Sequence, residues 1–84
     1  MPYVVYILKC ADKTLYIGFT NDIKKRLYTH NNLKSAAKYT KARRPVKLIY
    51  QEKFRNQTKA RQREWELKQL SRPEKLALIK TSKL

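Results

Sequence analysis

The sequence predicts a small α+β domain in which a three-stranded, mixed or antiparallel sheet is flanked by helices. β-branched and aromatic residues dominate three short segments, and capping residues precede the segments with helical character. The 84 residues include one glycine and three prolines, so regular structure should occupy most of the chain. We expect one domain over residues 1–84, with the order β-β-α-β-α-α and a frayed tail at 81–84.

The first two strands are expected to form a hairpin. Residues 3–9 are rich in valine, isoleucine and tyrosine, and the segment 11–14 contains Asp12, which suits a turn. Residues 15–19 are a second strand whose apolar residues are almost continuous. This pattern is typical of a sheet that is covered on both faces.

Capping residues place the first helix. Thr20 or Asn21 can accept a hydrogen bond from a free backbone N–H, and the helix should then run to about Asn31. Residues 33–45 are expected to form a basic loop. Residues 46–54 follow as a third strand, although their apolar positions alternate poorly.

Two further helices should close the chain. Asn56 or Thr58 is expected to cap a helix that runs to about residue 70. Residues 71–74 read Ser-Arg-Pro-Glu, which is a capping box with proline in the first turn. The last helix should therefore extend from there to about residue 80.

The charge balance indicates an anionic partner. Lysine and arginine number 21 and acidic residues 6, so the net charge is 21 − 6 = +15. Small soluble domains usually carry a net charge of about 2–8 in magnitude, and this excess repels itself unless an anion binds. We expect nucleic acid, DNA rather than RNA; a solvated basic surface, a membrane surface and an acidic protein are the alternatives. The residues expected to bind it are Lys24, Lys38, Lys41, Arg43 and Arg44.

Several classes of protein are excluded by composition. A single cysteine, Cys10, and a single histidine cannot make an internal disulfide or a multi-cysteine zinc site. The longest apolar run, residues 3–8, is far shorter than the ~18 residues needed to span a membrane. With no signal peptide visible, we expect a cytoplasmic protein.

The first expected helix places a cation and a histidine beside its apolar stripe. On a helical wheel, Arg26 and His30 lie one turn apart, at the edge of the stripe formed by Ile23 and Leu27. The simple interpretation is that Arg26 extends past the core and His30 is a helix-end histidine with satisfied hydrogen bonds. A functional pair is the alternative.

One acid of the second expected helix stands out. Glu64 lies on the same stripe as Ala60 and Leu67, whereas Glu66 points elsewhere. A carboxylate on a buried face costs several kcal/mol unless it is paired or binds a metal. A structural ion pair with an arginine and a metal site are both open on this pattern.

Two tyrosines and the glycine belong to the predicted hairpin. Tyr6 and Tyr16 share one face only if the numbers of paired residues sum to an even value, which the sequence leaves open. Each is otherwise an ordinary sheet aromatic. Gly18 in a strand indicates close approach by another backbone or a ligand.

Taken together, these residues resemble the GIY-YIG nuclease superfamily, and in particular its small single-domain members of uncharacterised function. The first signature is Val4, Val5, Tyr6, with valine in place of the first glycine, and the second is Tyr16, Ile17, Gly18. Arg26, His30 and Glu64 follow at family-like spacings, and the resemblance covers about residues 3–80. Residues 34–37 lack a glycine that close relatives often carry, and the extra DNA-recognition domain of better-known members is missing.

The resemblance implies hydrolysis of DNA phosphodiesters with one divalent metal, Mg²⁺ or alternatively Mn²⁺. By the same resemblance, Glu64 binds the metal and Arg26 holds the scissile phosphate. Tyr6 acts near the attacking water as its base, His30 takes the proton on, and Tyr16 positions water or phosphate. Tyrosine, with an ordinary pKa near 10, is a poor base unless a neighbouring cation or histidine lowers that pKa, which Arg26 and His30 are placed to do.

We therefore expect a DNA endonuclease with little sequence choice, structure-selective in DNA repair or processing, and monomeric unless a protein partner joins it. The main alternative is a basic nucleic-acid-binding module that kept the fold and lost turnover. A nuclease acting on RNA, a thiol enzyme using Cys10 and His30, and a ribosome-associated basic protein are further alternatives.

Overall fold

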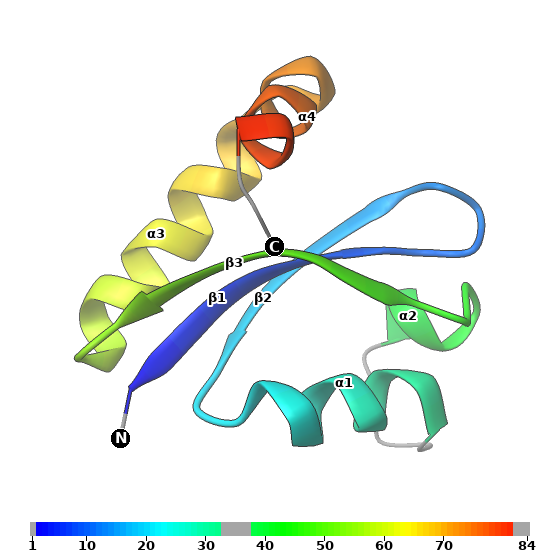
Figure 1. The fold of residues 1–84 in the computed structure, drawn as a ribbon, viewed down its shortest axis with the longest axis horizontal. Coiled ribbons are helices and arrows are strands. Elements are labelled where there is room, and N and C mark those ends of the chain that lie inside the picture. The colour runs from blue at the N-terminus through cyan, green and yellow to red at the C-terminus, as the bar shows by residue number, and fades with distance from the viewer. Residues whose placement is uncertain (1, 33–37, 82–84) are drawn as a thin grey trace.

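The structure, a computed structural model, describes residues 2–32 and 38–81, apart from the side chains of Lys38 and Tyr39. Within these residues a three-stranded sheet carries helices on both faces (Figure 1). The expected order is confirmed, with one short helix added before the third strand. The elements are β1 (Tyr3–Lys9), β2 (Leu15–Thr20), α1 (Ile23–Asn32), α2 (Lys38–Lys41), β3 (Lys47–Phe54), α3 (Gln57–Gln69) and α4 (Arg72–Thr81). The glycine-free segment 34–37 and most of the expected frayed tail lie outside the described residues.

The sheet is antiparallel throughout, with the strand order β2-β1-β3. In the hairpin turn the Asp12 carboxylate accepts the Thr14 N–H at 3.1 Å, and Lys13 has a φ of 69°. This turn sets the register, in which Tyr6 pairs with Gly18 and the numbers of paired residues sum to an even value. Tyr6 and Tyr16 therefore share one face of the sheet.

A bulge in β3 explains why its sequence alternates poorly. The pairing with β1 shifts between Ile7, opposite Tyr50, and Leu8, opposite Leu48. Because one extra residue enters β3 at this point, Leu48 and Tyr50 face opposite sides of the sheet, although they are two residues apart. The strand thus contributes apolar side chains to both cores.

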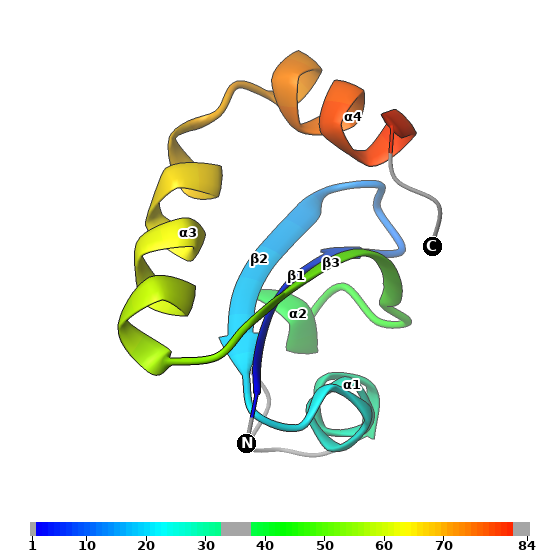
Figure 2. The same ribbon diagram turned by 60° about the vertical axis from the view of Figure 1, so that its left-hand side comes forward.

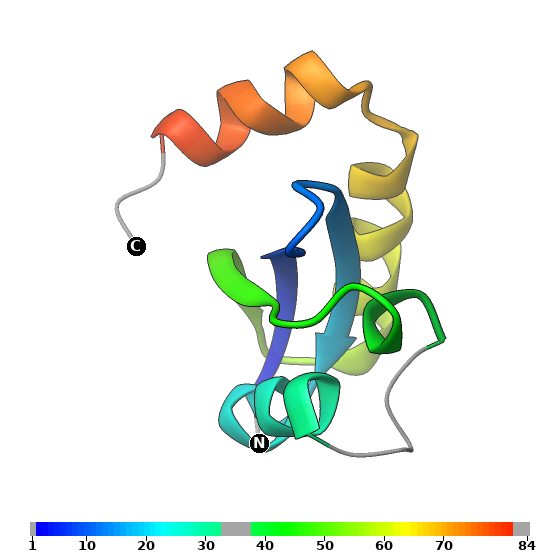
Figure 3. The ribbon, with the colours of Figure 1, turned by 90° about the vertical axis from the view of Figure 1, so that its right-hand side faces the viewer.

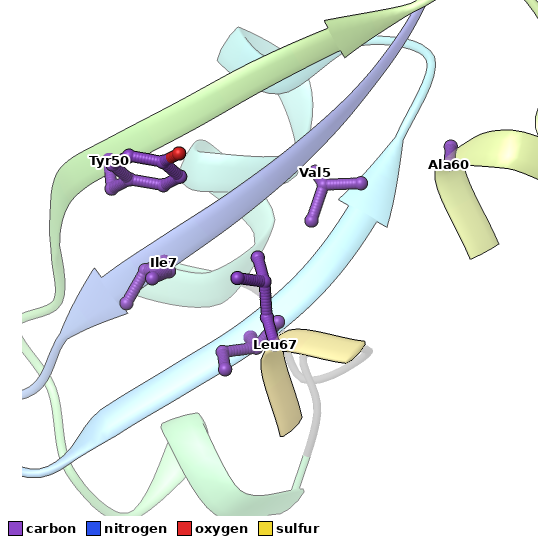
Figure 4. Close-up of a cluster of buried hydrophobic side chains, with 6 residues drawn as sticks. Val5, Ile7, Tyr50, Ala60 and Leu67 are labelled. Atoms are coloured by element: carbon purple, nitrogen blue, oxygen red, sulfur yellow. The ribbon is translucent and has the colours of Figure 1, made fainter. Parts of the chain in front are cut away.

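The two faces of the sheet form separate cores. On one face Val5, Ile7 and Tyr50 pack with Ala60 and Leu67 of α3 (Figure 4). On the other, Val4, Tyr6 and Leu8 pack against the partly buried Ile23 and Leu27 of α1. Figure 2 shows α3 and α1 on either side of the sheet, and Figure 3 shows α4 crossing over one end of it. The expectation that both faces are covered is confirmed.

Caps fix the helix ends, and one prediction about them is wrong. Asn56 accepts the Lys59 N–H at 2.8 Å to begin α3, and Ser71 and Glu74 form the expected capping box of α4. The cap of α1 is Asp22, whose carboxylate accepts the Lys25 N–H at 3.1 Å, instead of Thr20 or Asn21. Thr20 remains in β2, and its hydroxyl accepts the Asp22 N–H. None of the helices in residues 2–32 and 38–81 combines the length and apolar character that crossing a membrane requires.

Candidate active site

The centre of the candidate site is a buried hydrogen bond between Tyr6 and His30. Tyr6 extends from the central strand β1, and His30 comes from the last turn of α1; the Tyr6 hydroxyl and His30 Nε2 are 2.9 Å apart. Both residues are almost fully buried. Tyr16 of β2 packs edge-on against the same imidazole, with ring centroids 5.1 Å apart. The β1–β2 register and the α1 stripe together bring these three rings to one face.

Thr40 of α2 holds the other nitrogen of His30. Its Oγ1 lies 2.8 Å from His30 Nδ1, and both side chains are completely buried. No pattern in the sequence marks this residue, because a single helical turn in a basic segment has no apolar period. Only the tertiary contact with His30 distinguishes Thr40.

The hydrogen-bond partners assign the tautomer of His30. The buried Tyr6 hydroxyl needs an acceptor, and the guanidinium of Arg26 beside it offers donors alone. Among the described residues, His30 Nε2 is the acceptor within reach, so Tyr6 donates to Nε2. Nδ1 then carries the ring proton and donates it to Thr40 Oγ1. His30 thus presents a lone pair to the Tyr6 hydroxyl.

His30 is neutral at physiological pH. Its pKa is lowered from 6.5 to about 4, mainly by burial and additionally by the positive charges of Arg26 and Arg44. Arg44 acts from the C-terminal end of α1, where its Nε donates to the His30 carbonyl at 2.6 Å. The simple interpretation of His30 as a satisfied helix-end histidine is therefore correct as far as its hydrogen bonds go. Its partner, however, is a tyrosine that the resemblance also selects.

Arg26 lies next to both tyrosine hydroxyls. Partial burial alone would lower the pKa of its guanidinium, but interactions with the phenol oxygens of Tyr6 and Tyr16 outweigh burial and raise it. Arg26 lines a surface pocket of about 240 Å³ together with Thr20, Asp22 and other residues between β2 and α1. Its positive charge therefore faces solvent beside the tyrosines, where an anion can reach it.

The pKa of Tyr6 is raised, which corrects the expectation that its neighbours lower it. The pKa is raised to about 12: burial is the largest cause, Arg26 opposes it, and Tyr16 and Glu64 act in the same direction as burial. Tyr6 is accordingly a neutral phenol at pH 7 in the ligand-free protein. It can serve as a base only while it passes its own proton to His30.

Gly18 makes room for the Tyr6 ring. A Cβ atom at Gly18 would lie 2.6 Å from the Tyr6 hydroxyl oxygen and 2.8 Å from its Cζ. The predicted close approach is real, but it involves a buried side chain of the neighbouring strand instead of a backbone or ligand. Glycine at this position therefore allows Tyr6 to reach His30 across the hairpin.

Glu64 approaches from α3, on the opposite face of the sheet. The wheel prediction is confirmed: Ala60 and Leu67 are fully buried, and the Glu64 side chain is 21% exposed. Its carboxylate pairs with Lys68 at 3.5 Å, one turn along the same helix, whereas Arg63 bonds to Glu52 and Glu66. The alternative of an ion pair with an arginine does not hold for Glu64. An exposed i,i+4 pair with lysine is worth a few tenths of a kcal/mol and is easily exchanged.

The donor set at Glu64 fits Mg²⁺. Across residues 2–32 and 38–81, no three histidine, cysteine or acidic side chains gather at one place. Mg²⁺ usually keeps several waters and takes one or two carboxylates plus substrate phosphates, so a single accessible glutamate meets its needs. A Zn²⁺ site, with three or four protein ligands, does not fit.

The expected nucleic-acid-binding residues fall into two groups. Lys24 of α1 and Lys41 of α2 are exposed, and the side chain of Lys38 lies outside the described part. Arg43 pairs with Asp12 at 2.9 Å, and Arg44 caps the carbonyls of α1. The two arginines therefore have structural partners that any phosphate would have to share.

The thiol alternative loses its partner. Both ring nitrogens of His30 bond to Tyr6 and Thr40, and burial raises the pKa of the Cys10 thiol. Cys10 packs in the core below α1. A raised pKa and a buried sulfur are typical of a structural cysteine.

Comparison with known proteins agrees with this arrangement. The family described as the GIY-YIG catalytic domain matches residues 2–77. The chain is 52% identical over 77 residues to the UPF0213 protein SSP2268 of Staphylococcus saprophyticus, covering 92% of this chain and 93% of that relative. It is 55% identical over 76 residues to a UPF0213 protein of Syntrophus aciditrophicus, covering 90% and 87%. Fold and sequence together define a GIY-YIG domain of the nuclease type.

Solved structures give the same result. The solution NMR structure of the UPF0213 protein BH0048 from Bacillus halodurans matches with a TM-score of 0.62 at 39% identity, covering 95% of this chain and 84% of that one. The protein EF2693 from E. faecalis matches with a TM-score of 0.62 at 34% identity, covering 93% and 83%. The chain belongs to the UPF0213 group of the GIY-YIG family.

Proposed function

We propose that this protein is a metal-dependent endonuclease that hydrolyses DNA phosphodiesters with little sequence choice. The observation that carries the proposal is the convergence of Tyr6, His30 and Arg26 on one face of the sheet, with the charge of Glu64 acting on Tyr6 from the other. An acid whose charge reaches the same tyrosine as a phosphate-binding cation weakens simple DNA binding. It is useful where a metal ion must sit next to a phosphate.

Arg26 binds the scissile phosphate in this proposal. Its guanidinium offers several donors in a fixed fork, which suits two phosphate oxygens. As the reaction proceeds, negative charge grows on those oxygens, and a cation fixed beside them stabilises the transition state more than the substrate. The hydroxyl of Tyr16 interacts with Arg26 and orients the phosphate or the attacking water.

The proton route runs from water through Tyr6 to His30. Water attacks phosphorus and forms a P–O bond while the P–O bond to the leaving group breaks. The attacking water gives its proton to the Tyr6 oxygen as Tyr6 gives its own to His30 Nε2, which leaves an imidazolium. The phosphate anion offsets the charge of Arg26, one of the causes of the low His30 pKa, so substrate binding makes His30 a better acceptor.

Glu64 would hold the divalent metal, Mg²⁺ or Mn²⁺, whose chemistry here is to stabilise negative charge on the phosphate and leaving oxygen. The carboxylate lies at the edge of the apolar stripe, 21% exposed, and leaves most coordination positions to water and substrate. Its present partner, Lys68, is exposed and can move aside.

The second candidate is a basic binding module without turnover. The net charge of +15 favours it, and so does the raised pKa of Tyr6 in the ligand-free protein. A module that only binds needs neither the Tyr6–His30 hydrogen bond nor Glu64. The same residues would suit hydrolysis of RNA. Comparing cleavage of matched DNA and RNA substrates distinguishes the two activities.

The test is cleavage of end-labelled flapped, branched, duplex and single-stranded DNA, with matched RNA, in Mg²⁺ or EDTA. We expect Mg²⁺-dependent cleavage of DNA, and Arg26→Gln should lower the rate a hundredfold or more, about 2.7 kcal/mol of barrier. Lys53→Gln, which removes an exposed cation of β3, is the control and should cut at nearly the parent rate. If the protein binds these substrates but cleaves none of them in Mg²⁺ or Mn²⁺, the endonuclease proposal is wrong and the protein is a binding module.

A further inference from the structure

Two surface pockets lie at opposite ends of β2. One, of about 240 Å³, is lined by Thr20, Asn21 and Asp22 at the end of the strand and by Lys25, Arg26 and Thr29 of α1. The other, of about 220 Å³, is lined by Leu15, Tyr16 and Ile17 at the start of the strand, with Lys68 of α3 and Lys75 of α4. Each pocket therefore joins the strand to two cationic side chains from neighbouring helices.

Within the described residues, the outer edge of β2 pairs with no other strand, and the pocket at the start of β2 lies across this edge. β2 pairs with β1 on one side alone, since the strand order is β2-β1-β3. Tyr16 packs with the core under α1, whereas Leu15 and Ile17 pack with the core under α3. A pocket lined by residues from both faces must lie across the strand edge. Arg26 lines the pocket at the end of β2, and Tyr16 lines the pocket at its start.

The spacing of the pockets suits a nucleic-acid backbone. From Tyr16 to Thr20 the strand rises about 13 Å, at roughly 3.3 Å per residue. One strand of B-form DNA carries a phosphate for about every 3.4 Å of helix axis, so a duplex whose axis runs along this edge presents a short run of phosphates to it. Cationic side chains at both ends of the strand, with Arg26 among them at the end near α1, match such a run.

We propose that the cleaved strand lies along the free edge of β2, with flanking phosphates held by Lys25 at one end and by Lys68 and Lys75 at the other. This inference rests on the proposed function and defines the path of the substrate through that site. Acidic groups near the path are Asp22, which caps α1, and Glu64, which pairs with Lys68. The path otherwise carries positive charge.

Lys68 links this path to Glu64. In the ligand-free protein its ammonium lies 3.5 Å from the Glu64 carboxylate, and the Lys68 side chain is 53% exposed. A phosphate bound at Lys68 competes with Glu64 for the ammonium and so weakens this ion pair. Substrate binding at the α3–α4 end thereby frees the Glu64 carboxylate.

The test measures binding in EDTA, so that it does not depend on cleavage. Affinity for a short labelled duplex is measured against salt concentration for the parent, for Lys68→Gln with Lys75→Gln, and for Lys47→Gln with Lys53→Gln. The second pair removes the same charge from β3, the other edge strand, where both lysines are exposed. Far-ultraviolet circular dichroism and thermal unfolding check that all three proteins fold.

We expect the β2-edge variant to lose affinity and its slope of log K against log salt to flatten by about 1.8, the value for two phosphate contacts. The β3 variant should change the slope by less than half of that. Equal changes in both variants, or a larger change in the β3 variant, would overturn the proposed path. If the parent protein does not bind DNA at all, the proposed function itself is wrong.

Discussion

Thr40→Val tests the proposed proton route at the residue that bonds to His30 Nδ1. The substitution removes the hydroxyl that receives the His30 Nδ1–H while nearly keeping the shape of the side chain. Because Thr40 and His30 are both fully buried, the ring N–H loses its partner and water cannot replace it. A buried polar group left without a partner costs about 1–3 kcal/mol, which is the expected loss in the free energy of unfolding.

The Thr40→Val substitution should also change the tautomer of His30. Without Thr40 Oγ1, the Nδ1–H tautomer loses its advantage, and the Nε2–H tautomer, in which the ring donates to the Tyr6 oxygen and the Tyr6 O–H gives up its acceptor, should gain population. In that tautomer His30 does not accept the Tyr6 proton, and cleavage should fall about a hundredfold, the lower end of what acid–base catalysis supplies. The chain has one histidine, so ¹⁵N NMR of the imidazole reads the tautomer without assignment of other rings.

Thr40→Ser is the matched control, because it keeps the hydroxyl and loses only a methyl group, for about 1 kcal/mol. We expect it to retain the Nδ1–H tautomer and a rate close to the parent. The reasoning is refuted if the parent ring carries its proton on Nε2. It is also refuted if Thr40→Val keeps both the Nδ1–H tautomer and the parent rate.

Two further predictions concern stability. Folded His30 has a pKa of about 4 against 6.5 for the ordinary group, so between these pH values the unfolded chain takes up a proton that the folded chain does not. The free energy of unfolding should therefore fall as pH drops from 6.5 to 4, by up to about 3 kcal/mol in urea titrations; His30→Gln should lack this part of the decline, and identical pH profiles would contradict the assignment. Gly18→Ala should destabilise by about 1–3 kcal/mol, because its Cβ meets the buried Tyr6 ring at 2.6 and 2.8 Å. Adding Tyr6→Phe removes the nearer atom and should recover part of the loss, whereas a Gly18→Ala protein as stable as the parent would show that the contact relaxes freely.

Local signals in the sequence predicted the elements well. Asn56 and the Ser71–Glu74 box begin α3 and α4 as expected, because these caps depend on side chains within three residues of each other. The depth of Glu64 also followed from helical spacing alone. The cap of α1 was wrong because Thr20 extends β2, and a strand end is decided by pairing with β1.

Long-range geometry accounts for what the sequence left open. Whether Tyr6 and Tyr16 share a face depends on the hairpin register, which the turn around Lys13 sets. The wheel placed His30 at the edge of a stripe, but α2 closes over it and buries it completely. Thr40 belongs to that contact, and no pattern along the chain marks it.

The central claim is that Glu64 holds the metal for hydrolysis, and single-turnover cleavage by Glu64→Gln tests it most directly. The substitution keeps the volume and removes the charge, so cleavage should fall at least a hundredfold, about 2.7 kcal/mol of barrier, while binding in EDTA stays equal or tightens. Glu66→Gln, on an exposed position of the same helix, should cut at nearly the parent rate. A folded Glu64→Gln protein that cleaves like the parent would contradict the claim.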